Sequence, residues 1–311
     1  MMPPASRPDR LAHARRRGLG VVEVIVIFAI MGFVAILFLM SLPRGRESAR
    51  MATCQRNLMQ IGHGLALYHQ LQRHYPTVPA LGGREGDSPL KAMLDSFAVP
   101  DLLELHDPSN PPKASQAPPS GIRVPGLACP SDPNAMTGPS SAVVSYRANA
   151  GDDRAGLDGP FAPGRTTTSA EVEAADGQGY TAAVAERLVG DGKDRHPALQ
   201  NYARVPGPVP PAGCPRTPAD RWQGDAGASW AEASWRSTLY NHTMTPDAPA
   251  SCIAEDGKTA AIGASSGHVH RVNVLMMDGS LRVVSPSIDP KIWAGMGTVG
   301  RLETPPGSGR N

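Results

Sequence analysis

Residues 15–43 read RRRGLGVVEVIVIFAIMGFVAILFLMSLP, a basic cluster followed by an apolar run, 19–42, in which Glu23 is the only charged residue. At about 1.5 Å per residue, a helix over this run is long enough to cross the ~30 Å hydrocarbon core of a bilayer. The arginines before it favour a cytoplasmic N-terminus. The stretch therefore predicts a single-pass protein of the inner (cytoplasmic) membrane, in contact with membrane lipid, whose C-terminal domain is extracytoplasmic.

The acidic residue within this run requires an explanation. A charge at the centre of a bilayer costs about 2.5–3.5 kcal/mol or more, whereas Glu23 lies only one turn into the run. A secretory signal peptide has an apolar core of about 7–15 residues and a small-residue cleavage site. This segment has a longer core and no good site of that kind. A plain signal anchor and a specifically processed leader are the two remaining interpretations.

The sequence RRGL at 16–19, with Glu23 as the fifth residue after Gly18, resembles the N-terminal signature of type IV prepilins and pseudopilins. The resemblance implies that a prepilin peptidase cuts after Gly18 and methylates Leu19. It also implies that Glu23 pairs with the N-terminal amine of a neighbouring subunit. Phenylalanine and threonine commonly follow the glycine in that family, where this chain has Leu19 and Gly20.

On this resemblance the chain is a pilin-like or pseudopilin-like structural subunit and not an enzyme. Its implied partners are prepilin peptidase and other pilin or pseudopilin subunits, in a cell-surface filament or in the pseudopilus of type II secretion. The competing hypothesis is a single-pass envelope protein whose ectodomain binds a surface partner or carbohydrate without polymerising. Aromatic side chains such as Trp222, Trp230 and Trp235 would serve that binding, although buried packing is the more ordinary role of tryptophan.

A second apolar pattern follows Pro43. Apolar residues recur at steps of three and four, which is typical of one face of a helix; they are Met51, Cys54, Leu58, Ile61, Leu65, Tyr68, Leu71 and Tyr75. We expect the helix to continue over 43–76, with a kink or an interruption at Pro43 and an end at Pro76.

The expected organisation combines these elements. It comprises a basic leader over 1–18, a transmembrane helix over 19–42, an extracytoplasmic continuation over 43–76 and an extracytoplasmic domain over 77–311. The layout resembles pilins, which implies an α+β fold with a long N-terminal spine helix packed on an antiparallel β-sheet.

Composition agrees with a loop-rich domain. Glycine (33) and proline (32) make up about a fifth of the 311 residues, below the roughly 25–30% that indicates disorder. The formal net charge is only +2, and the leader arginines supply more than that excess. A weakly charged mature chain argues against nucleic acid as a partner.

Four cysteines, placed in an oxidising compartment by the expected topology, predict disulfides. Four cysteines allow three pairings, and the sequence alone does not choose between them. We prefer Cys214 with Cys252, which leaves Cys54 with Cys129. No two cysteines lie within four residues of each other, so the ligand spacing of a zinc finger is absent.

The C-terminal part carries the clearest local signal. Two β-prone runs, 272–277 and 280–284, flank Asp278-Gly279, and an Asp-Gly pair between such runs predicts a tight hairpin. Asp278 is therefore first a turn residue. His268 lies ten positions earlier, which gives the pattern His-x9-Asp-Gly. We also expect a short helix from Pro89 and a buried strand within 180–189 that carries Glu186.

Several motifs in order give a second resemblance. They are the run 43–75, CPSDP at 129–133, SYRANAG at 145–151, AER at 185–187, NHTMTPDAPASC at 241–252, and His268 with Asp278-Gly279. Together they resemble a large pilin-like family of planctomycete-type bacteria, which joins a prepilin leader to a domain of unknown function with a C-terminal H-x9-DG motif. That family commonly has a glycine pair after the motif histidine, where this chain has His270-Arg271.

Three chemical alternatives remain less favoured than turn and packing roles. A strand carrying His268 and His270 would present both rings on one face, where Asp278 could complete a metal site. The segment 263–267, GASSG, matches the G-x-S-x-G pattern of serine hydrolases but precedes a strand, whereas a nucleophile elbow leads into a helix. The third alternative is a calcium loop, which would use Asp152, Asp153 and Asp158 without EF-hand spacing. We expect no metal, no cofactor and no catalytic residue.

Overall fold

The computed structural model of the protein describes residues 20–82, 86–96 and 121–300. Within it the chain divides into two compact units, one ending at Arg46 and the other beginning at Glu47. The second unit holds the described strands and the candidate site.

The longest element is helix α1, Val21–Gln72. At its start the Gly20 N–H donates to the Glu23 carboxylate over 2.9 Å, so Glu23 satisfies a donor that the helix itself leaves open. The assigned helix continues through Pro43, which shows that the proline does not interrupt it. It ends at Gln72, before the expected stop, because Arg73 adopts a left-handed backbone conformation with φ of 65°.

Among the residues that the structure describes, no helix is long and apolar enough to cross a membrane. The predictions of a transmembrane spine helix over 19–42 and of a single-pass inner-membrane location were therefore wrong.

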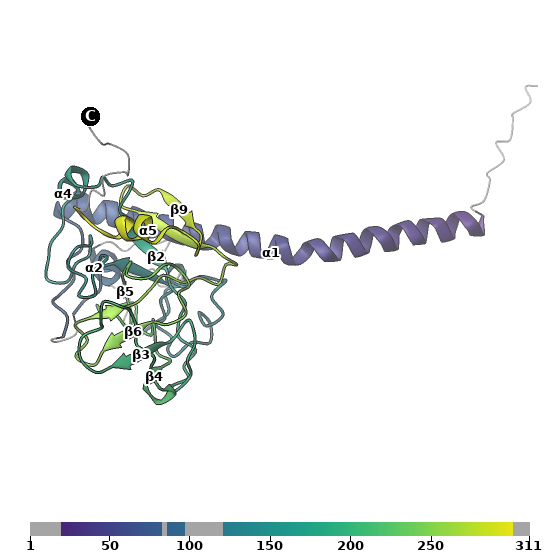
Figure 1. The fold of residues 1–311 in the computed structure, drawn as a ribbon. Helices are drawn as coiled ribbons and strands as arrows, with labels where there is room; N and C mark the ends of the chain where they lie inside the picture. Colours follow the sequence, from purple (N-terminus) through teal and green to yellow (C-terminus); the bar gives the residue numbers. More distant parts are fainter. Residues whose placement is uncertain (1–19, 83–85, 97–120, 301–311) are drawn as a thin grey trace, which may run out of the picture. The chain divides into compact units, whose positions relative to one another are not determined.

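A five-stranded sheet forms the centre of the second unit (Figure 1). Its order is β5-β1-β2-β8-β9, with the bounds β1 Tyr146–Asn149, β2 Ala182–Glu186, β5 Leu239–Tyr240, β8 Val272–Met276 and β9 Leu281–Val284. The β1–β5 pair is parallel and the other pairs are antiparallel. The expected buried strand is β2, and the expected hairpin is β8–β9.

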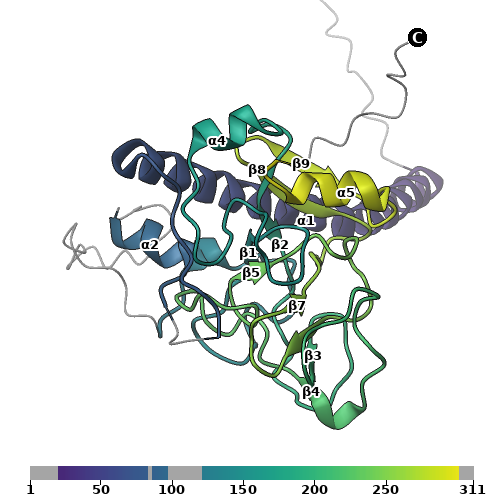
Figure 2. The ribbon, with the colours of Figure 1, turned by 60° about the vertical axis from the view of Figure 1, so that its left-hand side comes forward.

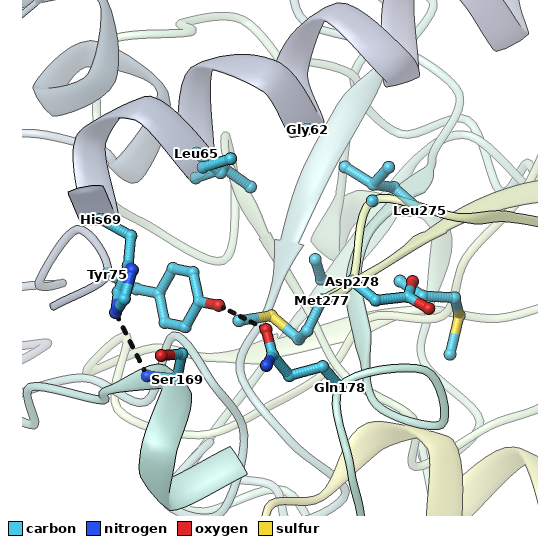
Figure 3. A pocket seen from close by; sticks show the side chains of 13 residues that line it. Gly62, Leu65, His69, Tyr75, Ser169, Gln178, Leu275, Met277 and Asp278 are labelled. Atoms are coloured by element: carbon cyan, nitrogen blue, oxygen red, sulfur yellow. Dashed lines mark hydrogen bonds between the residues drawn. The ribbon is translucent and has the colours of Figure 1, made fainter. Parts of the chain in front are cut away.

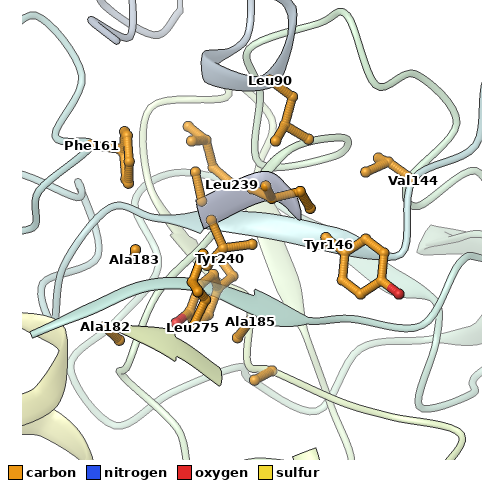
Figure 4. Close-up of a cluster of buried hydrophobic side chains, with 14 of the residues drawn as sticks. Leu90, Val144, Tyr146, Phe161, Ala182, Ala183, Ala185, Leu239, Tyr240 and Leu275 are labelled. Carbon is orange, nitrogen blue, oxygen red and sulfur yellow. The ribbon is translucent and has the colours of Figure 1, made fainter. Parts of the chain in front are cut away.

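The later part of α1 packs on this sheet through the predicted apolar stripe. Leu58 and Ile61 are fully buried in the main core, whereas Leu71 at the far end of the stripe is 60% exposed. Gly62 lets the helix come close, because a Cβ there would lie 3.0 Å from the side chain of Leu275 on β8. Figure 4 shows the adjoining core, where side chains of β1, β2, β5 and β8 gather.

A second sheet was not predicted. It has four short strands in the order β4-β3-β6-β7, with bounds β3 Tyr202–Val205, β4 Trp222–Gln223, β6 Cys252–Ala254 and β7 Ala260–Ala261. Strands β3 and β6 are parallel. It lies on the far side of the five-stranded sheet from α1 (Figure 2). The expectation of one antiparallel sheet is thus corrected to a mixed α+β fold with two sheets, each containing one parallel pair.

Short helices complete the unit. They are α2 Pro89–Ser96, α4 Ser169–Ala174 and α5 Pro290–Gly297, with 3-10 turns at Pro125–Leu127 and Ala219–Arg221. Helix α2 confirms the expected helix from Pro89. The three tryptophans considered for surface binding, Trp222, Trp230 and Trp235, are at most 7% exposed, so they pack in the interior.

Candidate functional site

The two ends of the H-x9-DG motif lie in different surroundings. Asp278 and Gly279 form the β8–β9 turn, where the Ser280 N–H donates to Asp278 Oδ1 over 2.8 Å. Gly279 has a φ of 83°, a conformation that favours glycine. His268 is buried at 3% exposure, and no contact between described residues joins it to Asp278. The motif therefore supplies one turn and one separate buried histidine.

The turn borders a cavity of about 240 Å³ between α1, α4 and the end of β8 (Figure 3). The Tyr75 hydroxyl donates to Gln178 Oε1 over 3.1 Å at its edge, and the Ser169 N–H donates to His69 Nε2 over 3.4 Å. Its floor is apolar and includes Leu275. Two pairs of polar groups at this cavity are therefore hydrogen-bonded to each other.

His268 lies between two carboxylates from distant parts of the chain. Its Nδ1 lies 2.6 Å from Glu47 Oε1 on α1, and its Nε2 lies 3.5 Å from Glu186 Oε1 at the end of β2. The side chains of His268 and Glu186 are each 2% exposed, whereas that of Glu47 is 40% exposed. We define Glu47, Glu186 and His268 as the histidine–carboxylate cluster.

Neighbouring polar groups hold both carboxylates in place. Glu186 accepts hydrogen bonds of 2.9 Å from the backbone N–H and the side-chain amide of Asn273. Gln55 on α1 donates to Asn273 Oδ1 over 3.1 Å, which links the helix to β8. The Ser131 hydroxyl donates to Glu47 over 3.1 Å. Each carboxylate thus has partners besides the histidine.

The electrostatic balance favours the charged histidine. Burial alone would lower the pKa of His268, but the hydrogen bonds and negative charges of Glu186 and Glu47 raise that pKa above its usual value of 6.5. A raised pKa in the folded state means that the protonated cluster stabilises the fold fully below about pH 6.5. That stabilisation is lost as the pH rises through the folded-state pKa.

A disulfide adjoins the cluster. Cys54 of α1 is bonded to Cys129, and Cys214 is bonded to Cys252, which is the pairing we preferred from the sequence. Cys129 Sγ lies 3.7 Å from His268 Nε2 and 3.8 Å from Glu186 Oε1. One potential ligand atom from each of Cys54, Cys129, Glu186 and His268 lies within 4.8 Å of the others. Within residues 20–82, 86–96 and 121–300, these four form a group that could hold a metal ion.

The other chemical alternatives do not assemble into sites. His270 is exposed, with a φ of 54°, and does not belong to the described group of potential metal ligands around His268. Ser265 is fully buried, and its hydroxyl accepts from the Leu188 N–H over 3.1 Å. Asp153 accepts hydrogen bonds from the backbone N–H groups of its own loop, as a turn-forming residue does. Among processing residues, Gly18 and Leu19 lie outside the described residues, and Glu23 caps α1.

Sequence reasoning missed two members of this arrangement. Glu47 was one of several charged residues after Pro43, and Asn273 lay inside a strand. A polar residue inside an otherwise apolar β-run was the available signal for Asn273, because a buried amide needs partners. No local signal distinguishes Glu47, which lies 221 residues from His268.

Residues 43–291 match a family described as "Protein of unknown function (DUF1559)". This chain belongs to the DUF1559 family. The match includes every residue of the histidine–carboxylate cluster and both disulfides, but it begins after Gly18, Leu19 and Glu23. No curated protein and no solved structure matches the chain.

Membership confirms the family-level resemblance seen in the ordered motifs. The DUF1559 description assigns no role to the H-x9-DG pattern. In this chain, however, three of the motifs meet at one place. CPSDP supplies Cys129 and Ser131, AER supplies Glu186, and the H-x9-DG pattern supplies His268, so these motifs of the chain come together beside α1.

The buried carboxylate provides a direct test of this arrangement in the DUF1559 fold. Replacing Glu186 with glutamine is expected to lower the free energy of unfolding by about 2 kcal/mol, because an amide nitrogen would face the donors of Asn273 or the histidine and leave a buried group unpaired. Urea unfolding at pH 6, followed by tryptophan fluorescence, measures the change. The exposed Glu173→Gln variant is the control, and equal stability of the two variants would show that the cluster contributes nothing.

Proposed function

We propose that this member of the DUF1559 family is a pilin-like or pseudopilin-like structural subunit that assembles with copies of itself through the first part of α1. The supporting observation is a continuous set of exposed apolar side chains. Their exposed fractions range from 37% to 76%, and the residues are Val21, Val22, Val24, Ile25, Val26, Ile27, Phe28, Ile30, Met31, Phe33 and Val34. A patch of this kind marks an interaction surface.

Packing equivalent helices together would remove this surface from water, at about 25 cal/mol for each Å² of apolar area buried. The side chains surround the helix rather than forming a single stripe, since consecutive residues from Val24 to Phe28 are all exposed. A helix that is apolar all round is typical of an element buried on every side. The proposal therefore places each helix among several copies rather than in a simple pair.

Processing belongs to the same proposal. A prepilin peptidase would remove residues 1–18 and methylate Leu19, leaving a new amine four residues before Glu23. The carboxylate, which bonds to the Gly20 N–H within its own chain, would then pair with the amine of a neighbouring subunit. A charge buried without its partner is strongly destabilising, so this pairing would set the register between subunits. The role proposed is assembly rather than catalysis.

Substitution of Glu23 tests the proposal. In cells that process the chain, Glu23→Ala is expected to reduce the fraction in sedimentable filaments by on the order of tenfold or more, because the partner amine would be buried unpaired at a cost of about 3–5 kcal/mol. Asp220→Ala is the control, since Asp220 is exposed and remote in sequence. Electron microscopy and quantitation of the pellet give the readout.

N-terminal sequencing of the same samples separates processing from assembly. A methylated Leu19 in both wild type and Glu23→Ala, with filaments only in wild type, supports the proposal. Unchanged filament yield in Glu23→Ala, or a mature chain that retains its arginine-rich leader, contradicts it. The alternative of carbohydrate or surface binding through tryptophans has no comparable support, because those three side chains are buried.

A further inference from the structure

We propose that the Cys54–Cys129 disulfide conceals a metal site. When this disulfide is reduced, Cys54, Cys129, Glu186 and His268 bind one Zn²⁺ ion through two thiolates, a carboxylate oxygen and an imidazole Nε2. All four residues are buried, and one potential ligand atom from each already lies within 4.8 Å of the others. Tetrahedral coordination by sulfur, nitrogen and oxygen is the preference of zinc in proteins.

The distances agree with this geometry. Zinc binds sulfur at about 2.3 Å and nitrogen or oxygen at about 2.0–2.2 Å, so ligand atoms at the corners of the tetrahedron are roughly 3.3–3.8 Å apart. Cys129 Sγ lies 3.7 Å from His268 Nε2 and 3.8 Å from Glu186 Oε1, and these last two atoms are 3.5 Å apart. Three edges of the tetrahedron are therefore in place, and the bonded sulfur atoms must separate to complete it.

The surrounding groups orient the ligands as metal sites require. A histidine that binds zinc through one nitrogen almost always donates the other N–H to a carboxylate, a carbonyl or water. Here Nδ1 lies 2.6 Å from Glu47 Oε1, which directs Nε2 toward the two cysteines. Glu186 is held by Asn273. Such outer partners are worth about 10–100-fold in metal affinity.

A trialkylphosphine is a suitable reductant of the Cys54–Cys129 disulfide. The phosphine attacks one sulfur atom and, with one water molecule, becomes the phosphine oxide. The S–S bond breaks, two electrons pass to the sulfur atoms, and each sulfur takes up one proton. Binding of Zn²⁺ then releases both thiol protons, and the Nε2 proton of a charged His268, to solvent, because the thiolate and the neutral imidazole are the forms that bind metal. A disulfide-bonded pair offers no thiolate to a metal ion, so the redox state of Cys54 and Cys129 controls metal binding.

Cobalt(II) gives a direct readout, since it occupies tetrahedral zinc sites and its thiolate complexes are coloured. The full-length chain in mild detergent is titrated with Co²⁺ before and after treatment with the phosphine. The same titration is made on a Cys214→Ala/Cys252→Ala variant, which retains only the Cys54–Cys129 pair. We expect one equivalent of Co²⁺ with a thiolate charge-transfer band in the reduced samples of both proteins, displacement by Zn²⁺, and no such band in the oxidised samples.

Two substitutions distinguish a metal ligand from a residue that orients that ligand. His268→Gln removes a ligand and is expected to weaken Co²⁺ binding at least 100-fold, whereas Glu47→Gln is expected to weaken it 10–100-fold while keeping the charge-transfer band. His270→Gln, two residues away on the surface, is the matched control and should bind as the wild type does.

Circular dichroism establishes the folded state of each sample. A reduced and folded chain without the charge-transfer band overturns the proposal, and so does a reduced chain that stays unfolded at saturating Zn²⁺. Equal affinity of His268→Gln and His270→Gln, or metal binding unchanged by oxidation, overturns it as well.

Discussion

Replacing both Cys54 and Cys129 with alanine is expected to lower the free energy of unfolding by about 4 kcal/mol. The two residues are separated by 75 positions. In the loop-closure account, a cross-link of that length removes roughly 4 kcal/mol of conformational entropy from the unfolded chain at 25 °C. The bond also joins α1 to the segment before β1, so its loss frees the helix that covers the five-stranded sheet.

The second disulfide provides the matched control for this prediction. Cys214 and Cys252 are separated by 38 positions, and the same account makes their cross-link weaker by about 0.6 kcal/mol. Urea unfolding of the two double-alanine variants and the wild type, followed by tryptophan fluorescence, measures both effects. A Cys54/Cys129 variant that loses less than about 1 kcal/mol would show that the helix is held by packing alone.

Acidification from pH 7 to pH 4 is expected to remove about 3 kcal/mol of stability through His242 alone. Burial lowers the pKa of His242 to about 3, against an unfolded value near 6.5. Between these values the unfolded chain binds a proton that the folded chain excludes. The contribution is therefore fully present above pH 6.5 and is lost as the pH falls.

The contacts of His242 explain why it stays neutral. Its Nδ1 lies 2.7 Å from the Trp293 carbonyl and so carries the proton, and its Nε2 lies 2.9 Å from the Tyr240 hydroxyl and so accepts. The ring stacks on Trp293 at 3.9 Å between centroids. No carboxylate of the described residues bonds to it, so nothing offsets a buried positive charge.

The measurement compares how steeply the free energy of unfolding changes with pH in two proteins, rather than their absolute stabilities. His242→Gln keeps a polar side chain that does not titrate, so its unfolding free energy should fall by about 3 kcal/mol less than that of the wild type between pH 7 and pH 4. The carboxylates titrate equally in both proteins and cancel in the difference. Identical slopes for the two proteins would mean that His242 protonates in the folded state without cost.

Local patterns predicted several elements of this fold. The Asp278-Gly279 pair and its flanking β-prone runs predicted the β8–β9 hairpin, which the structure contains in register from Val272 with Val284 to Leu275 with Leu281. The three- and four-residue spacing after Pro43 predicted the buried face of α1. Both signals depend on neighbouring residues, whose periodicity follows from backbone geometry.

Apolar composition was a poorer guide than periodicity. The run over 19–42 predicted a transmembrane helix, but none of the described helices is long and apolar enough to span a membrane. The tryptophans considered for surface binding are interior residues, because an aromatic side chain gives no indication in sequence of which elements will cover it. The four-stranded sheet was also missed, since two of its strands, Trp222–Gln223 and Ala260–Ala261, are too short to show a period.

The sequence by itself determined the family, through a series of short motifs, and it determined the hairpin turn, the buried strand that carries Glu186 and the apolar face of α1, because each of these three follows from the spacing of nearby residues. Only the tertiary structure decided that Glu47, Glu186 and His268 meet beside the Cys54–Cys129 disulfide. The first and last of these lie 221 residues apart, and their contact arises from packing α1 against β2 and β8. Such packing depends on the shapes of whole helices and strands, which cannot be predicted from the spacing of neighbouring residues in the sequence.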